Sequence, residues 1–418
     1  MHVLLPTLGS AGDVHPTIAL ALALRDRGHR ATVITSPYFK EQIEYLGLGF
    51  APVGTVEGAQ QVLANPDLWH PRRGFEVIAR SVMVPSIPAI YDAIASRADR
   101  NTVVVASGIS FGARIAQDKL GIPTATLHLQ PSIVRSQVDN GLAGYVRISA
   151  SQPMWFKKAF FRLVDWFVVD KYLKRPINEF RASLGLAPVD RIFHQWIHSP
   201  DLVLAFFPEW FAPRQPDWPA NLHCVGFVLW DAAGHAPVPP DAERFLEQGE
   251  PPVIFTPGSA ASTLHRFFEQ SVKALEGTSV RAMMVTNFPE QLPPNLPSNI
   301  RQFGYLPFSE VLPRAALLVH HGGIGTIAQA IKAGIPHLVV PNGHDQFDNG
   351  WRIEQLGLGV SIHGTRYKAE KVKAALRKLL HDEALRKRCR EYADRIDSEA
   401  SLNRACDLVE QLAARKLS

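Results

Sequence analysis

The stretch that most constrains the fold of this chain is residues 317–349, LLVHHGGIGTIAQAIKAGIPHLVVPNGHDQFDN. Apolar residues 317–319 predict a buried strand, the pattern from Thr326 predicts a helix, and residues 337–340 predict a second strand, which together make one βαβ unit. The turn before the helix contains two histidines and three glycines. Such a turn exposes backbone N–H groups that have no partner inside the helix, and the helix dipole adds partial positive charge there. We therefore expect this turn to bind an anion such as phosphate.

A glycine-rich turn alone is weak evidence, because close packing of a helix on a strand also requires small residues. The polar residues around the turn strengthen the prediction. His321 directly precedes the glycines and can place a protonatable ring nitrogen on a diphosphate, while Thr326 adds a hydroxyl at the helix start. Asp345 and Gln346 follow the second strand and can bind hydroxyl groups. Phosphate donors and hydroxyl acceptors at neighbouring strand ends predict a site for a sugar nucleotide.

The pattern His-Gly-Gly-x-Gly-Thr, followed after the next strand by Asp-Gln, resembles the donor-binding signature of the family-one nucleotide-sugar glycosyltransferases. The resemblance implies an α/β protein of the GT-B fold, in which two Rossmann-like, doubly wound parallel-sheet domains face each other across a cleft. It implies that Asp345 and Gln346 bind the sugar hydroxyls. Members often grip the ribose with a Glu three residues after the Thr, where this chain has Gln329. The residues implied to hold the diphosphate are His321, Gly322, Gly323, Gly325 and Thr326.

The beginning of the chain predicts a second βαβ unit of the same kind. Residues 2–8 predict a strand, residues 9–13 a turn, residues 16–27 a helix and residues 30–35 the next strand, an order that favours a doubly wound parallel sheet. Asp13 lies in the turn after the first strand, where it is either a helix N-cap or a functional group.

The string Gly-x-x-Gly-Asp-Val-x-Pro at residues 9–16 again resembles the family. The resemblance implies that Asp13 serves as, or beside, the catalytic base, with His15 as a second candidate. Residues Ser10, Ala11 and Gly12 of the same turn are then expected to contact the acceptor. Residues 102–107 and 124–129 predict two more strands of this sheet, so Ser107 and His128, near their ends, are expected to line the acceptor pocket.

A proline-rich segment, residues 229–252, predicts an interdomain linker with a short helix near residues 242–248. We therefore expect an acceptor-binding domain over residues 1–228 and a donor-binding domain over residues 253–395. By resemblance to the family, the last helix, residues 396–418, packs back on the first domain. The same resemblance implies that the turn Gly258-Ser259 contacts the diphosphate and that Tyr305 and Leu306 bind the base through backbone groups. A plain N-cap serine at 259 is compatible with that role.

Composition excludes several other classes. The length of 418 residues suits two domains. No run of about 18 uncharged apolar residues is present and the N-terminus lacks a basic start and cleavage site, so we expect a cytoplasmic protein without a spanning helix. The three cysteines are scattered, which fits reduced thiols. The net charge of +5 comes without a basic stripe, so no nucleic acid is expected. No Asp-x-Asp occurs, so neither a catalytic metal nor a cofactor is implied beyond the nucleotide-sugar co-substrate.

Two segments have alternative interpretations. Residues 153–180 alternate aromatic and basic residues at helical spacing, which predicts either a helix packed on the core or one that covers an apolar acceptor or touches a membrane. His194 and His198 share a helical face, but zinc would need a third ligand, so a structural pair is favoured. The strings HQWIHSP and EWFAPRQPDWP are similar to the rhamnosyltransferases of bacterial rhamnolipid synthesis, which glycosylate a hydroxy fatty acid dimer.

The function predicted from these features is an inverting, metal-independent transfer of rhamnose or glucose from a nucleoside diphosphate to a hydroxyl of an apolar acceptor, with a hydroxy fatty acid lipid as the leading acceptor. UDP-glucose transfer to sterols, polyketides or phenols is the alternative. A sugar-nucleotide epimerase or hydrolase would need carboxylates on both sides of the sugar. A non-catalytic partner subunit or lipid carrier would have no reason to keep the residues of the donor site. A monomer or homodimer, with possible peripheral contact at the inner face of the membrane, is compatible with the sequence.

Overall fold

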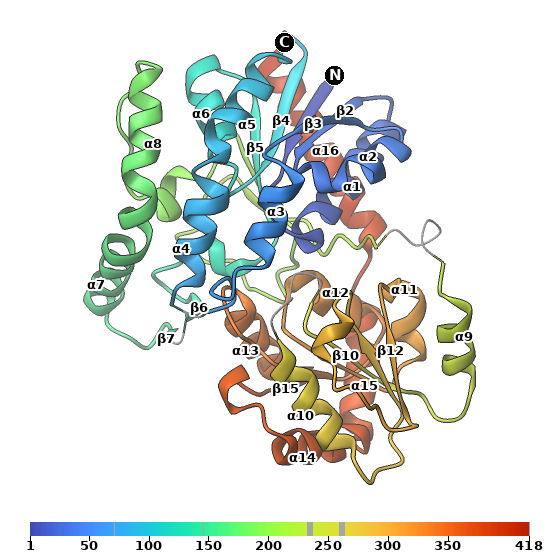
Figure 1. Cartoon of the computed structure of the whole chain (residues 1–418). Helices are drawn as coiled ribbons and strands as arrows, with labels where there is room; N and C mark the ends of the chain where they lie inside the picture. The colour runs from blue at the N-terminus through green and yellow to red at the C-terminus, as the bar shows by residue number, and fades with distance from the viewer. Residues whose placement is uncertain (71, 145, 232–236, 259–263, 418) are drawn as a thin grey trace. The chain divides into compact units, whose positions relative to one another are not determined.

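A computed structural model describes residues 1–70, 72–144, 146–231, 237–258 and 264–417, which form two compact units (Figure 1). Unit 1 comprises residues 1–68, 72–228 and 398–418, and unit 2 comprises residues 69–71 and 229–397. The boundary after residue 228 lies where the sequence predicts the linker to begin. The predicted linker itself clusters with unit 2 and contains helix α9 (Pro240–Glu247). The short segment 69–71 also clusters with unit 2, which nothing in the sequence predicted.

Unit 1 is built on a seven-stranded sheet in which all neighbouring strands are parallel, with the order β3-β2-β1-β4-β5-β8-β9. Because β1 pairs with β2 on one side and with β4 on the other, the chain reverses its direction of travel across the sheet between β1 and β4. Loops after these two strands therefore meet at a topological switch point, where such sheets bind ligands. The strands are β1 (His2–Pro6), β2 (Arg30–Thr35), β3 (Gly49–Pro52), β4 (Thr102–Ser107), β5 (Thr124–His128), β8 (Leu202–Ala205) and β9 (Leu222–Cys224).

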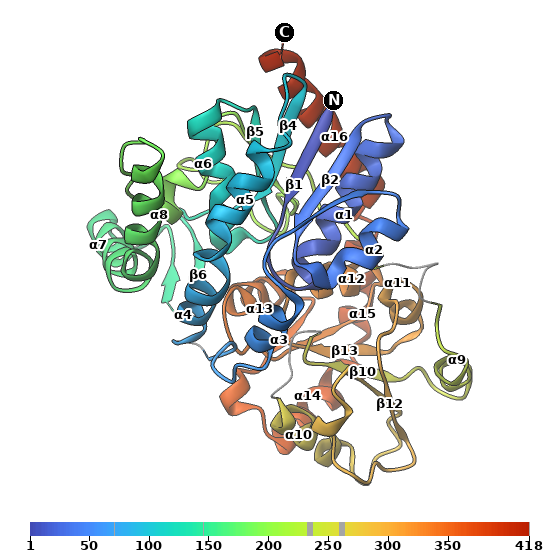
Figure 2. The ribbon, with the colours of Figure 1, turned by 45° about the horizontal axis from the view of Figure 1, so that its top comes forward.

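The helices of unit 1 cover both faces of this sheet. Right-handed crossovers that run in opposite directions from the switch point place α1 (Ala11–Asp26) and α6 (Phe111–Leu120) on opposite faces, as Figure 2 shows. The other α-helices are α2 (Lys40–Tyr45), α3 (Val56–Leu63), α4 (Gly74–Ile78), α5 (Ser86–Ala95), α7 (Met154–Val164), α8 (Lys171–Ser183) and α16 (Ser398–Leu417). A small antiparallel pair, β6 (Gly141–Ala143) and β7 (Val146–Ile148), precedes α7.

The last helix, α16, is part of unit 1 and packs against α1. Arg27, at the end of α1, bonds Asp407 at 2.6 Å and Glu410 at 3.0 Å, and His29 Nε2 lies 2.8 Å from the other Glu410 oxygen. From the sequence alone, the charges of this tail are most simply a solvated face, but some of them form ion pairs within the unit.

Unit 2 repeats the architecture with a six-stranded parallel sheet of order β12-β11-β10-β13-β14-β15, so its switch point lies between β10 and β13. Its strands are β10 (Val253–Thr256), β11 (Ala282–Val285), β12 (Ile300–Phe303), β13 (Leu317–His320), β14 (His337–Val339) and β15 (Gly359–Ser361). Besides α9, its helices are α10 (His265–Leu275), α11 (Phe308–Val311), α12 (Ile324–Lys332), α13 (Gln346–Leu356), α14 (Ala369–Leu380) and α15 (Glu383–Ala393).

Three predicted helix boundaries are wrong. Helix α1 begins at Ala11 rather than at residue 16, because Ser10 and Asp13 cap an earlier first turn. Helix α12 begins at Ile324, two residues before the predicted start. The sequence predicts two helices in the tail, around residues 372–380 and 385–412, but the structure has three there, α14, α15 and α16. The Asp382 side chain accepts from Leu385 N at 2.8 Å and caps the start of α15.

One helical stretch, Gly74–Ala95, is long and apolar enough to cross a membrane by length and composition, whereas the sequence predicted none. The core helices of globular proteins satisfy the same criteria. Here the stretch is divided into α4, a π-helical segment (Ala79–Met83) and α5. Its buried side chains, among them Met83, Ile87, Ile90 and Ile94, belong to the hydrophobic core of unit 1.

Candidate functional site

The glycine-rich turn of unit 2 connects β13 to α12 and lies at the switch point of the sheet. Gly323 is the N-cap of α12, and the first bond of the helix runs from Ile327 N to Gly323 O. The backbone N–H groups of residues 323–326 have no hydrogen-bond partner among the described residues. Four free N–H groups at a helix start, with no side chain to cap them, form a binding site for an anion.

The Gly322 N–H is not one of these free groups, which corrects the expectation that the whole turn cradles the diphosphate. It donates to His320 Nδ1 at 3.2 Å, and His320 Nε2 lies 3.1 Å from His337 Nδ1. Since His320 Nδ1 accepts, its Nε2 carries the proton and donates to His337. Burial lowers the pKa of both rings, that of His337 to about 3, so the pair is neutral. The hydrogen bond from Gly322 N–H to His320, which is itself bonded to His337, fixes the backbone of the turn.

The glycines of the turn serve different purposes. A Cβ at Gly322, whose φ is +93°, would come within 2.8 Å of Val339, so this glycine allows the turn to pack on β14. A Cβ at Gly323 would come within 2.4 Å of the His321 ring. A Cβ at Gly325 would meet nothing within 4 Å, so this position is open. Packing therefore explains the glycines at 322 and 323 but not the one at 325. The space beside Gly325 adjoins the free N–H groups.

His321 lies between two glycines of neighbouring loops. Its ring would clash with a Cβ at Gly258, which follows β10, as well as with one at Gly323. Its Nδ1 atom is buried and has no partner among the described residues. Burial lowers the pKa of His321 to about 4, so this ring, expected from the sequence to be protonatable, is neutral at physiological pH. A neutral imidazole can still donate one N–H to a diphosphate.

Ser259 lies outside the described residues, so the structure carries no information on its predicted contact. Trp69 adds a ring that sequence reasoning missed, because this residue is far away in the chain. Its indole lies edge-on to the rings of His321, at 6.5 Å between centroids, and His344, at 5.5 Å. Both contacts fall within unit 2.

Thr326 and Gln329 lie one helical turn apart on α12, and neither side chain has a hydrogen-bond partner among the described residues. Their positions, three residues apart, put them on one face of the helix. Both groups are partly exposed and available for a ligand.

Asp345 and Gln346 form the start of α13, and their roles are more restricted than predicted. Gln346 is 2 % exposed, and its side-chain carbonyl accepts from Asn342 N at 2.9 Å and Gly343 N at 3.2 Å. Only its amide nitrogen can therefore serve a sugar. One Asp345 oxygen accepts from Asn349 Nδ2 at 2.6 Å.

Asn349 is a residue that the sequence reasoning missed. The same Nδ2 also donates to Gly322 O at 2.9 Å, and Oδ1 is buried without a partner among the described residues. The Asn349 side chain thus links the glycine-rich turn, at Gly322, to Asp345. The available signal was its spacing, one helical turn after Asp345 on the same face.

The predicted base-binding residues follow β12. The Tyr305 hydroxyl donates to the carbonyl of Asp231, and burial raises its pKa. The Asp231 carboxylate in turn accepts from Ser309 N at 2.7 Å. Leu306 has a buried side chain, and its backbone N–H and C=O have no partner among the described residues. Backbone groups left free in this way are suited to a flat heterocycle.

The catalytic candidate of unit 1, Asp13, is the third residue of α1. Its Oδ2 atom accepts from Ser10 N at 2.9 Å and from Ser10 Oγ at 3.4 Å, which makes Ser10 the N-cap and excludes that role for Asp13. The carboxylate folds back over Gly9, where a Cβ would lie 2.2 Å from Oδ2 and where φ is +125°. Burial raises the pKa of Asp13 to about 6 against the effect of the two hydrogen bonds. A carboxylate with such a pKa is a competent general base near pH 7.

Two other predicted residues of unit 1, Ser107 and His15, lie near the turn that precedes α1. Ser107 Oγ bonds Ser110 Oγ at 2.8 Å, and Ser110 Oγ donates to Pro6 O at 3.3 Å, so the ends of β4 and β1 are joined next to the turn that carries Ser10, Ala11 and Gly12. His15 is two residues from Asp13, so the two side chains leave the helix on different sides. The His15 ring lies edge-on to Phe39 at 6.5 Å.

His128 is buried and so does not line a pocket as predicted. Its Nε2 lies 2.9 Å from His198 Nδ1, and its ring occupies the space that a side chain at Gly108 would need. Burial lowers the pKa of His198 to about 4. His198 therefore has His128 as its hydrogen-bond partner, while His194 lies in a π-helical turn, Ile192–Trp196. Among the described residues, no group of three or more His, Cys, Asp or Glu could hold a metal ion.

Comparison with known proteins agrees with this architecture. Residues 3–136 match the glycosyltransferase family 28 N-terminal domain, and residues 276–412 match the erythromycin biosynthesis protein CIII-like C-terminal domain. The chain is 28 % identical over 432 residues to O-mycaminosyltylonolide 6-deoxyallosyltransferase of Streptomyces fradiae, an alignment that covers 99 % of this chain and 98 % of that protein.

Two solved structures share the fold at lower identity. The glycotransferase of kitacinnamycin has a TM-score of 0.75 at 19 % identity, with 98 % of each chain covered. The glycosyltransferase VinC, solved in complex with dTDP, has a TM-score of 0.66 at 19 % identity, with 99 % of this chain and 100 % of VinC covered.

The two parallel sheets and the matched domains define the class of protein: this chain is a glycosyltransferase with the GT-B fold. The fold and the enzyme class predicted from the sequence are thereby confirmed. Within that class it is a family-one/family-28 glycosyltransferase of the erythromycin CIII-like type. The roles of individual site residues remain predictions.

Proposed function

We propose that the protein is an inverting, metal-independent glycosyltransferase that transfers rhamnose from a dTDP-linked donor to the hydroxyl of a hydroxy fatty acid lipid. The observation that carries the donor half is the uncapped start of α12, with free N–H groups at residues 323–326 next to the unpartnered Nδ1 of His321. The proposed activity is that of the rhamnosyltransferases of bacterial rhamnolipid synthesis.

Support for the donor comes from two relatives. VinC was solved in complex with dTDP. The Streptomyces fradiae relative is named for the transfer of a 6-deoxyallosyl group, and rhamnose is likewise a 6-deoxy sugar. Support for the lipid acceptor is the similarity of residues 194–200 and 209–219 to the rhamnolipid enzymes. Glucose transfer from UDP-glucose to a sterol, polyketide or phenol is the alternative outcome of the tests below.

The mechanism uses one carboxylate of unit 1 and several hydrogen-bond donors of unit 2. In unit 1, the ionised carboxylate of Asp13 accepts the proton of the acceptor hydroxyl as its oxygen attacks the anomeric carbon. The bond from that carbon to the diphosphate oxygen breaks in the same step, and the leaving diphosphate takes the electron pair. In unit 2, the N–H groups at the α12 start and the His321 ring stabilise the charge on the diphosphate, each worth about 3 kcal/mol. Attack opposite the leaving group inverts the anomeric configuration.

The donor site is tested by calorimetric titration of the purified protein, without added metal, with dTDP, UDP and NAD. We expect tight binding of dTDP, weaker binding of UDP and none of NAD. His321→Ala should weaken dTDP binding at least tenfold because it removes a ring donor and leaves the space between Gly258 and Gly323 empty. His381→Ala, at the exposed residue that ends α14 in the same unit, is the matched control.

Two results would contradict the proposal. If neither dTDP nor UDP binds, the assignment of the donor site is wrong and a carrier or partner subunit is favoured. If UDP binds more tightly than dTDP, the site stands and the donor assignment changes. The acceptor is tested separately, by mass spectrometry of a hydroxy fatty acid dimer incubated with the enzyme and dTDP-rhamnose.

A further inference from the structure

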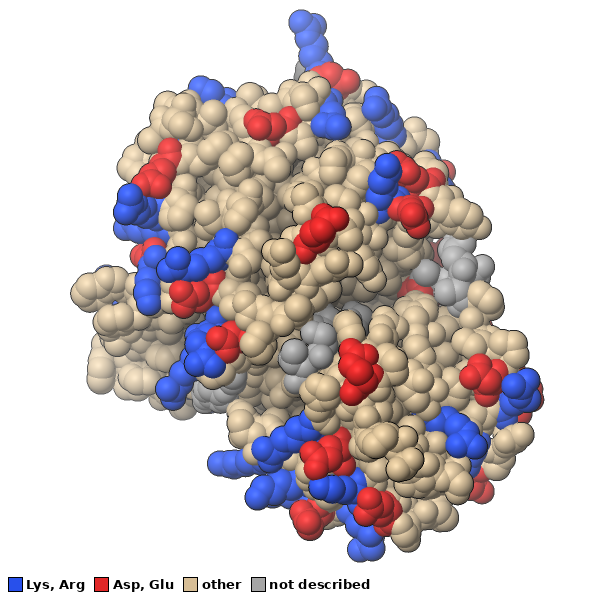
Figure 3. All heavy atoms as spheres, in the orientation of Figure 1, with Lys and Arg blue, Asp and Glu red and all other residues tan. Residues whose placement is uncertain are grey.

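The outward side of α7 and of the π-helical segment after it (Asp165–Asp170) exposes an unusual set of large apolar side chains, here called the α7 face. Its members are Met154 (44 % exposed), Trp155 (72 %), Leu163 (51 %), Trp166 (68 %), Phe167 (63 %) and Val168 (38 %). The other exposed large apolar residues among the described ones, Tyr38, Tyr45, Leu120 and Tyr305, lie elsewhere in the chain. In Figure 3 the surface where α7 lies is mainly uncharged.

The α7 face is a second apolar side of a helix whose first apolar side is already packed. Phe161 and Val169 are buried in unit 1, as an amphipathic helix requires. Trp155, Leu163 and Trp166 are eight and three residues apart, which places them on a common opposite side. In a helix with one apolar side, those positions would be polar. The sequence favoured packing of the aromatic side on the core; the structure packs one side and leaves the other uncovered.

The helix is anchored so that this side cannot turn inward. The buried Lys157 ammonium donates to Val138 O at 3.0 Å and Ser149 O at 3.3 Å. Arg135 forms an ion pair with Asp165, and its guanidinium lies 5.6 Å from the centroid of the Phe161 ring. These contacts fix both ends of α7 to the rest of unit 1.

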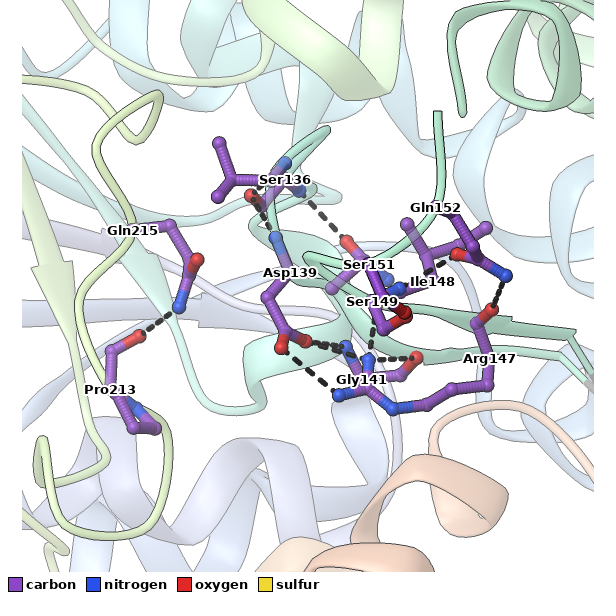
Figure 4. Close-up of polar contacts among 12 residues, drawn as sticks. Ser136, Asp139, Gly141, Arg147, Ile148, Ser149, Ser151, Gln152, Pro213 and Gln215 are labelled. Atoms are coloured by element: carbon purple, nitrogen blue, oxygen red, sulfur yellow. Dashed lines mark hydrogen bonds and ion pairs between the residues drawn. The ribbon is translucent and has the colours of Figure 1, made fainter. Parts of the chain in front are cut away.

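The segment that leads into α7 is also fixed by polar contacts (Figure 4). Ser136 Oγ accepts from Val138 N at 2.9 Å, and Asp139 bonds Arg147 at 2.6 Å across the β6–β7 pair. Gln152 Nε2 donates to Arg147 O at 2.7 Å, directly before the helix begins. These contacts fix the chain directly before α7, and the contacts of Lys157 and Arg135 fix the helix itself.

Basic residues accompany the exposed aromatic ones. Lys158 and Arg162 are exposed on α7, and neither forms an ion pair among the described residues. No acidic residue occurs between residues 154 and 164. Tryptophans at the surface with free cations beside them are typical of helices that lie in the headgroup region of a bilayer, where indoles bind the interface and cations bind anionic lipids.

A second copy of the chain fits this surface less well. In a two-fold symmetric contact whose axis crosses the helix between Lys158 and Arg162, Lys158 of one copy would approach Arg162 of the other, because residue pairs are reciprocal in such interfaces. Like charges would then be brought together without an acidic partner on the helix.

We propose that the α7 face is a membrane-docking surface, which lies in the headgroup region of an anionic bilayer with Trp155, Trp166 and Phe167 inserted and with Lys158 and Arg162 on the lipid phosphates. Docking by this surface requires no glycosyl transfer. Its test therefore remains valid if the proposed activity is wrong.

The test is co-flotation of the full-length protein with vesicles of phosphatidylethanolamine and phosphatidylglycerol. We expect the protein to float, and the triple variant Trp155→Ser, Trp166→Ser, Phe167→Ser to lower the partition coefficient about 100-fold, because each aromatic side chain contributes to insertion. The matched control is Tyr38→Ser with Tyr45→Ser, which removes two exposed aromatic residues from another part of unit 1 and should leave flotation unchanged.

The charge contribution is measured with Lys158→Glu and Arg162→Glu, which should abolish the preference for anionic over neutral phosphatidylcholine vesicles. The proposal is overturned if the wild-type protein stays unbound, or if the triple variant floats as the wild type does. The proposal is also overturned if the wild-type protein does not bind vesicles but is a dimer by light scattering and the triple variant is a monomer. The α7 face would then bind a second copy of the chain. Circular dichroism of each variant checks that unit 1 remains folded.

Discussion

Each unit has a helix that begins at the switch point of its parallel sheet, α1 in unit 1 and α12 in unit 2. The two helices differ in how their first turns are capped. In unit 1, α1 is capped by its own residues, since Asp13 accepts from the backbone N–H of Ser10. In unit 2, α12 has Gly323 at the N-cap, and Thr326 occupies the position equivalent to Asp13, the third residue of the helix. One start is closed by a carboxylate, and the other is open.

The difference indicates how a repeated architecture gives two kinds of chemistry. A free helix start attracts an anion, because its N–H groups and dipole are unsatisfied. A start that already holds a carboxylate repels a second anion. Its carboxylate is instead held at a fixed place with a pKa of about 6, which suits proton transfer. In the proposed mechanism, binding of the leaving group and activation of the acceptor therefore belong to different units.

The largest effect is expected from Asp13→Asn, which keeps the hydrogen bond from Ser10 and removes the base. Turnover should fall by about three orders of magnitude, the range of general-base catalysis. The affinity for dTDP should not change, because the donor residues belong to unit 2. Initial rates and calorimetry measure the two quantities.

The same variant should not be less stable. Burial raises the Asp13 pKa from 3.8 to about 6, so the folded state disfavours the ionised side chain above pH 6. Replacing it with a neutral amide removes that cost, and the Tm at pH 8 should stay equal or rise. A fall in Tm together with the loss of turnover would indicate a structural role for the carboxylate. Unchanged turnover would remove Asp13 from the mechanism.

A substitution that gives α12 the cap of α1 is expected to have the second largest effect. In Thr326→Asp the new carboxylate would accept from Gly323 N–H and repel the diphosphate. We expect dTDP affinity to fall about 100-fold, while the new cap leaves Tm equal or higher by an effect of about 1 kcal/mol. Calorimetry and thermal denaturation measure these changes, and Thr326→Ser is the matched control. Undiminished dTDP affinity in the Asp variant would mean that the helix start does not bind the phosphates.

The pH dependence of kcat/KM should reveal the titration of Asp13 at the start of α1. With a pKa of about 6, Asp13 is protonated at lower pH and cannot accept a proton, so kcat/KM should fall about tenfold per pH unit below that value and level off above it. His321, with a pKa of about 4, stays neutral over this range and adds no second limb. Asp13→Asn should have a flat residual profile between pH 5 and pH 8. A wild-type midpoint near pH 4 would exclude a raised carboxylate pKa.

Much of this arrangement could be predicted from the sequence. The βαβ patterns around residues 2–35 and 317–340 were sufficient to predict doubly wound parallel sheets, because periodicity and turn chemistry act locally. The GT-B fold followed from the resemblance to the family. The positions of His321 and Asp13 after strand ends followed from the same rule. The helix starts were misplaced, since caps such as Ser10 with Asp13 depend on side-chain geometry that spacing alone does not reveal.

The contacts between distant residues could not be predicted. His320 with His337 and His128 with His198 are buried pairs that form only when separate strands and loops pack together. Trp69 meets His321 from a segment far away in the chain. The uncovered side of α7 was also hidden, because aromatic residues at helical spacing fit a packed helix as well as an exposed one.

The smallest effect is expected from Asn349, which links the glycine-rich turn to Asp345, one of the two residues predicted to bind the sugar. Its Nδ2 bonds Gly322 O and Asp345, so Asn349→Ala should loosen the turn relative to Asp345. We expect about a tenfold increase in KM for the donor with a smaller change in kcat, because the residue positions the groups that bind the donor. Asn349→Asp is the informative comparison, because it keeps the side-chain shape but removes the N–H donor and places a second carboxylate beside Asp345. Its KM for the sugar-nucleotide donor should be higher than that of Asn349→Ala. If KM is unchanged in both variants while Tm falls, Asn349 serves only the packing of α13, and the turn is held by His320 alone.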